Sequence, residues 1–189
     1  LALVAAALAV GLWVFDRPIS FAPSPDWEAS VDRPEIIRTQ IMVPVDGAEI
    51  EAEVLVPAGG AARKPAVVFT PGSGDSLVQA YAPGFIETYL QDIFLPRDMI
   101  VVLANKRGMG ASTGSFYNNT LQGRADDIYA VVEALRARDD IDPARIGVSG
   151  HSQGGWVVQI LALEHPDLAF AIDFMGPLRS TWDQFDFMH

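Results

Sequence analysis

A serine flanked by glycines lies in the segment RIGVSGHSQGGW, residues 145–156. Ser152 has Gly150 two residues before it and Gly154 two residues after it. A short apolar run leads into this Gly-x-Ser-x-Gly string and an apolar stretch follows it, which is the strand–turn–helix context of a nucleophile elbow. A serine presented in this way can attack a carbonyl carbon once a base removes its proton. The competing interpretation is a glycine-rich turn in which the serine only caps a helix.

The turn itself explains these residue types. A strand that becomes a helix within a couple of residues forces Ser152 into a strained backbone conformation. Side chains at Gly150 and Gly154 would then collide, so both positions require glycine. Ser152 is expected at a helix N-terminus, where the backbone N–H of Gln153 and the helix dipole can stabilise an oxyanion.

A second oxyanion donor is expected from the loop that follows the apolar run at 66–70. This loop reads Pro-Gly-Ser-Gly-Asp, residues 71–75, and its small residues let the backbone approach a substrate. The backbone N–H of Ser73 is the first candidate and that of Gly74 is the second. A plain strand-to-helix turn is the alternative.

Hydrophobic periodicity indicates the elements that must position these groups. Residues 37–43 and 50–56 alternate between apolar and other residues around Asp46-Gly47, which predicts an antiparallel hairpin. Strands and helices then alternate, so we expect an α/β fold with a mostly parallel sheet behind this N-terminal hairpin. The expected strands are 66–70, 99–104, 146–149 and 169–175, and the expected helices are 121–135 and 152–165, the second apolar nearly all round.

The N-terminal segment differs from the rest of the chain. Residues 1–15 are uncharged and apolar, and they are expected to continue upstream because the chain begins with Leu. We favour a single membrane anchor over a signal peptide, since no small-x-small cleavage site follows and Trp13 suits a membrane interface. Either interpretation predicts an extracytoplasmic protein, anchored or secreted; a buried core helix is a third. Residues 16–34 contain four prolines and are expected to form a linker, followed by the α/β domain at 35–189.

Composition excludes several classes of partner. The chain has 13 basic and 24 acidic residues, a formal charge of −11, which disfavours nucleic acid and anionic membrane surfaces. It has no cysteine, so disulfides and thiolate chemistry are excluded. Its three histidines form no metal-ligand pair. We expect no metal and no organic cofactor, and a small-molecule ester or short peptide as substrate.

Four segments resemble the α/β-hydrolase family, near dienelactone hydrolases and prolyl-oligopeptidase-like and Xaa-Pro-peptidase-like enzymes and esterases. They are TPGSGD (70–75), NKRGMGASTG (105–114), IDPARIGVSGHSQGG (141–155) and FMGP (174–177). The resemblance implies that the turn beginning at Arg107 shapes the site without taking part in the chemistry. Asn105 and Pro71 stand where the family often has Asp and His, which blurs the subfamily but not the fold.

The catalytic base is missing from this pattern. The family order is Ser, then Asp or Glu, then His. His151 is expected to pack beside the turn, and His165 lies roughly 20 Å along the same helix from Ser152. His189 is the last residue and follows no strand that could carry the acid. The resemblance implies two more strands, so we expect the sheet to be incomplete and the acid and histidine to lie beyond residue 189.

The sequence therefore predicts a serine hydrolase that cleaves a carboxylic ester through an acyl-enzyme on Ser152. A serine peptidase of the prolyl-oligopeptidase-like or Xaa-Pro-peptidase-like type is the alternative, although nothing in this sequence supplies a propeller. A catalytically inactive hydrolase fold that serves as a binding module is an alternative of another class.

Overall fold

The computed structural model describes residues 34–81, 84 and 86–176. The segment expected to be a membrane anchor or signal peptide and nearly all of the expected linker lie outside the described residues, as does the tail after residue 176. Within the described part, no helix is long and apolar enough to cross a membrane. The structure thus describes the α/β domain.

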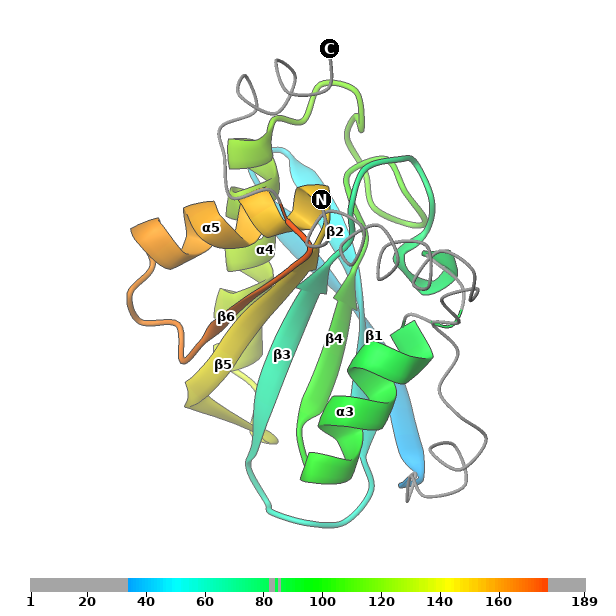
Figure 1. Ribbon diagram of the computed structural model, residues 1–189, viewed down its shortest axis with the longest axis vertical. Coiled ribbons are helices and arrows are strands. Elements are labelled where there is room, and N and C mark those ends of the chain that lie inside the picture. Colours follow the sequence, from blue (N-terminus) through cyan, green and yellow to red (C-terminus); the bar gives the residue numbers. More distant parts are fainter. Residues whose placement is uncertain (1–33, 82–83, 85, 177–189) are drawn as a thin grey trace, which may run out of the picture. The chain divides into compact units, whose positions relative to one another are not determined.

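The described strands form one mixed sheet with the order β1-β2-β4-β3-β5-β6 (Figure 1). β1 and β2 are antiparallel, β2 is antiparallel to β4, and the other neighbours are parallel. Asp46 (φ 40°) and Gly47 (φ 73°) form the turn between β1 and β2, as two-residue hairpins require, so the predicted hairpin is confirmed. The strands are β1 (Ile36–Val45), β2 (Ala48–Pro57), β3 (Lys64–Thr70), β4 (Ile100–Ala104), β5 (Ile141–His151) and β6 (Ala171–Phe174).

Helices cover the two faces of the sheet. Helices α4 (Leu121–Arg136) and α5 (Gln153–Glu164) lie on one face, and a helical stretch that contains α3 lies on the other (Figure 1). Successive strand residues alternate between these layers, so Val68 packs with α4 and α5 whereas Val67 packs with the other layer. The helical stretch that contains α3 consists of a π-helical part (Ile86–Gln91), α3 (Asp92–Phe94) and a 3-10 turn (Leu95–Arg97). A separate 3-10 turn (Val78–Ala80) precedes it in the chain.

Two expectations need correction. β5 begins at Ile141 rather than at residue 146, because a register shift between Lys64 and Ala66 lets β3 pair with the earlier residues too. α5 is not buried all round: Leu161 is fully buried, but Leu163 is 86% exposed. An apolar residue type does not decide burial, since burial also depends on which elements pack outside a helix.

The loop between β4 and α4 is fastened to its surroundings by buried polar contacts. Arg107 donates bidentate hydrogen bonds of 2.7–3.0 Å to Asp127 on α4, and this carboxylate also accepts from Asn119 (2.7 Å). The Thr120 side chain accepts from the Gly123 N–H and caps α4. Arg107 thus ties the loop to the helix.

Asn105 explains one departure from the family pattern. Its Nδ2 donates to Oε2 of buried Glu51 (2.9 Å), and its Oδ1 accepts from the Val78 N–H (2.8 Å). An aspartate at 105 would place a second carboxylate against Glu51, which like-charge repulsion disfavours. Asparagine is therefore the residue that fits beside this buried glutamate.

We expect Asp127→Asn to lower the free energy of unfolding by about 3 kcal/mol, because it leaves the Arg107 charge without its partner. Asp126→Asn is the matched control: it removes the same charge from the next residue, which is exposed, and should change the value by less than about 0.5 kcal/mol. Urea denaturation measures both. Equal effects of the two substitutions would show that the Arg107–Asp127 pair does not hold the loop.

Candidate active site

Ser152 joins β5 directly to α5. Its backbone has φ 55° and ψ −121°, a region that L-residues rarely adopt. The Ser152 N–H donates to the carbonyl oxygen of Phe174 on β6 (3.0 Å), and its own carbonyl accepts from Gly155 (2.8 Å). The serine is thus presented at the carboxyl end of a parallel strand and at the N-terminus of a helix.

Three glycines around Ser152 leave no room for side chains. A Cβ on Gly150 would lie 2.1 Å from the carbonyl oxygen of Gly154. A Cβ on Gly154 would lie 2.4 Å from the carbonyl oxygen of Thr70, and one on Gly155 would lie 2.2 Å from Oδ1 of Asp173. Backbone cannot give way as a flexible side chain can, so Gly150 and Gly154 let β5, α5 and β3 approach this closely.

The loop after β3 lies against the serine through Gly72. A Cβ on Gly72 would lie 3.1 Å from the Ser152 Cβ and 3.2 Å from the His151 carbonyl oxygen. Ser73 and Gly74, the expected oxyanion donors, are the next two residues, and Gly74 has φ 93°. No hydrogen bond between described residues engages the backbone N–H of Ser73, Gly74 or Gln153.

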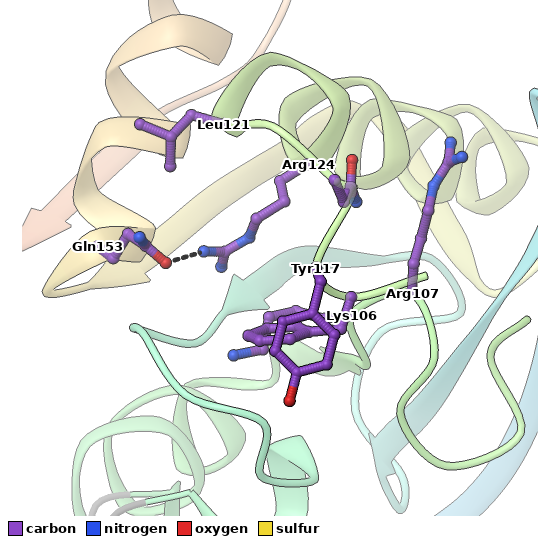
Figure 2. A pocket seen from close by; sticks show the side chains of 8 residues that line it. Lys106, Arg107, Tyr117, Leu121, Arg124 and Gln153 are labelled. Atoms are coloured by element: carbon purple, nitrogen blue, oxygen red, sulfur yellow. Dashed lines mark hydrogen bonds between the residues drawn. The ribbon is translucent and has the colours of Figure 1, made fainter. Parts of the chain in front are cut away.

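A buried arginine connects this loop to α5. Arg124, near the start of α4, donates to Oε1 of Gln153 (2.8 Å), as Figure 2 shows. It also donates to Oγ1 of Thr70 (3.0 Å) and to the carbonyl oxygen of Pro71 (2.6 Å). Burial lowers the pKa of Arg124 to about 10, so it remains a cation at neutral pH.

A buried lysine holds the next part of the loop. Nζ of Lys106 donates to the carbonyl oxygens of Gly72 (3.0 Å) and Gly74, and it lies 5.0 Å from the centre of the Phe116 ring. Burial, with a smaller contribution from Arg124, lowers the pKa of Lys106 to about 8. The amine therefore stays mainly protonated at neutral pH, and two buried cations orient the 70–74 backbone.

Tyr81 and His151 form a pair beside the loop. The Tyr81 hydroxyl lies 2.5 Å from Nδ1 of His151, and it occupies the space that a Cβ on Gly72 would need. The His151 ring lies between Tyr81 and Phe174, at ring-centre distances of 5.6 and 5.8 Å. Burial raises the pKa of Tyr81 and lowers that of His151, because each charged form loses solvation. His151 thus packs in a ring cluster.

His165 and Asp173 also have defined contacts in the structure. His165 follows the last residue of α5 and stacks on Tyr129, with ring centres 3.4 Å apart. Asp173 accepts hydrogen bonds from Gln159 and from the Gly176 N–H. His189 lies outside the described residues. The described residues contain no group of three His, Cys, Asp or Glu side chains that could hold a metal ion.

Sequence reasoning missed Gly72, Tyr81, Lys106 and Arg124. One signal could have found Arg124: it falls three residues after Leu121 and four before Ile128, on the apolar stripe of α4. A charged side chain on a buried face of a helix needs hydrogen-bond partners, so its presence there indicates a polar site.

The chain is similar to known hydrolases. Residues 88–172 match the family model described as the prolyl oligopeptidase family. The α/β hydrolase domain-containing protein WAV2 of Arabidopsis thaliana is 36% identical over 83 residues, which are 44% of this chain and 26% of WAV2.

Solved structures share the fold. The α/β hydrolase GrgF from Penicillium superposes with a TM-score of 0.62 at 22% identity, over 77% of this chain and 48% of GrgF. A bacterial heroin esterase superposes with a TM-score of 0.53 at 22% identity, over 76% of this chain and 43% of the esterase. The chain thus spans half or less of the length of these proteins. The sheet, the family-model match and the α/β hydrolase relative place the chain in the α/β-hydrolase superfamily.

Proposed function

We propose that this protein is a serine hydrolase that cleaves a carboxylic ester through Ser152. The observation that carries the proposal is the backbone of Ser152, strained at φ 55° on a turn where Gly150 and Gly154 admit only hydrogen. Strain of about 1–3 kcal/mol persists where the surrounding structure enforces it, and it clusters at functional sites. A serine that only capped the helix would not need this conformation.

The proposed reaction has two steps. Oγ of Ser152 bonds to the ester carbonyl carbon while a base takes its proton, and the C–O bond then breaks to release the alcohol with that proton. Water next attacks the acyl-enzyme, releases the carboxylic acid and restores Ser152. The backbone N–H groups of Gln153 and Ser73 would hold the oxyanion. The base and its acid fall to residues outside the described part, since His151 and His165 are held in ring contacts.

We expect a fluorophosphonate probe to label the full protein on Ser152, because such probes phosphonylate activated serines. Ser152→Ala should abolish labelling, and Ser149→Ala should preserve it, since that serine is buried in β5 three residues earlier. Mass spectrometry of the labelled peptide identifies the site. A folded protein that takes no label would support the inactive binding module instead.

The oxyanion assignment is tested at Ser73, where the proposed donor is the backbone. Ser73→Pro removes the N–H and should lower kcat for p-nitrophenyl acetate by about 100-fold or more. Ser73→Ala removes only the hydroxyl and should keep the wild-type rate, and thermal denaturation checks the folding of both. Wild-type turnover by Ser73→Pro would exclude Ser73 and leave Gly74 as the candidate.

Peptidase activity is the second candidate, favoured by the match to the prolyl oligopeptidase family model. We expect p-nitrophenyl acetate to be hydrolysed and alanyl-prolyl p-nitroanilide to remain intact. Both release a chromophore that is followed by absorbance, and the Ser152→Ala protein gives the background. Hydrolysis of the anilide at a higher kcat/KM than the ester would reverse the assignment.

A further inference from the structure

A cavity of about 230 Å³ lies next to the serine turn. Gln153, the residue after Ser152, forms part of its wall, and the first turn of α4 and the loop before it form the rest (Figure 2). Its lining residues are Lys106, Arg107, Phe116, Tyr117, Asn119, Leu121, Arg124 and Gln153. The described part of the wall therefore contains three basic side chains and no acidic one, in a chain with almost twice as many acidic as basic residues.

Within the described part of the chain, two of these cations have no carboxylate partner. Three basic side chains are buried among the described residues: Lys64, Lys106 and Arg124. Lys64 forms a salt bridge with Asp98, and the half-buried Arg107 forms one with Asp127. Among the described residues, Lys106 and Arg124 instead donate only to neutral oxygens. A buried charge without a countercharge destabilises the folded protein, so we expect Lys106 and Arg124 to serve a function that offsets this cost.

Neighbouring acids do not neutralise this pair of charges. Asp75 acts on Lys106 at longer range, but its side chain is exposed and forms no salt bridge with Lys106 in the described structure. Asp127 acts on Arg124 in the same way while it binds Arg107. Lys106 and Arg124 also repel each other, which is one cause of the lowered pKa of Lys106. The pocket thus keeps a positive potential that an anion would relieve.

We propose that the ester cleaved by this protein carries a carboxylate, and that this carboxylate binds in the pocket beside Lys106 and Arg124. The inference rests on the proposed hydrolase function and names its substrate class. Phe116, Tyr117 and Leu121 supply apolar surface for a short carbon chain between the carboxylate and the ester. Half-esters of aliphatic dicarboxylic acids have this chemistry, and guanidinium and ammonium groups bind carboxylates through charge-assisted hydrogen bonds.

Binding to the full protein with Ser152→Ala tests this without turnover. The ligands are the monomethyl esters of succinic, adipic and suberic acid, each beside the neutral compound in which a primary amide replaces the free carboxylate. Isothermal calorimetry should show at least one half-ester binding about tenfold or more tightly than its amide. The amide keeps the size and the ester, so the ratio reports the replacement of the anionic carboxylate by a neutral group.

Two pocket variants locate the interaction. Arg124→Gln and Lys106→Gln, each in the Ser152→Ala protein, should weaken binding of the half-ester about tenfold more than they weaken binding of the amide. Arg97→Gln is the matched control, because Arg97 is exposed, has no salt bridge among the described residues and is not part of the pocket. It should change neither affinity. Thermal denaturation checks that each variant is folded.

The outcomes separate this inference from the function on which it rests. Equal affinity for half-ester and amide at all three lengths, or no binding of either, overturns the carboxylate preference, and it does so without any pocket variant. If Ser152 is nevertheless labelled by fluorophosphonate, the hydrolase function stands and only the substrate class fails. Selective half-ester binding by a protein that takes no label supports the anion pocket and overturns the hydrolase function.

Discussion

The left-handed backbone of Ser152 constrains everything around it. At φ 55° the residue is strained, so neighbouring elements must enforce its conformation. The hydrogen bond from its N–H to Phe174 ties the turn to β6, and the parallel pairing of His151 with Phe174 continues this attachment. Gly154 brings α5 against the Thr70 carbonyl at the end of β3. Three strands and one helix therefore meet where a nucleophile would have to be rigid, and the first amide of α5 is oriented by the same contacts.

The features that the sequence predicts are those governed by local rules. Asp46-Gly47 predicts the hairpin because few residue pairs tolerate the turn it needs, and short apolar runs predict the parallel strands because such strands are buried on both faces. The serine turn is predictable for the same reason, since the lack of space for a side chain at Gly150 arises within a five-residue segment. The error in α5 has the opposite origin. The exposure of Leu163 is decided by what packs against the helix, and no local pattern contains that information.

The polar contacts around the 70–74 loop could not be predicted from local sequence patterns. Lys106 is one of two adjacent basic residues in the segment 105–114, and only the fold brings its amine to the carbonyls of Gly72 and Gly74. Gly72 is one of two glycines in its loop, yet it alone lies against Ser152 and the Tyr81 hydroxyl. Each contact joins residues at least nine positions apart and depends on how the strands are ordered. Arg124 is the exception, because a charge on an apolar stripe is visible in the sequence.

The choice of hydrogen-bond acceptors has an electrostatic consequence. Aspartate or glutamate side chains could accept hydrogen bonds from Lys106 and Arg124, as Asp127 does from Arg107. Each such carboxylate would, however, neutralise one positive charge. Backbone carbonyls and the oxygens of Gln153 and Thr70 fix the same geometry and leave both charges in place. Burial strengthens the electric field of those charges because little water screens them. Burial also removes the solvation of the Lys106 ammonium, and this loss lowers its pKa. Lys106 and Arg124 thus already donate several hydrogen bonds, but among the described residues no carboxylate pairs with either charge. This difference is the basis on which we propose an anionic ligand.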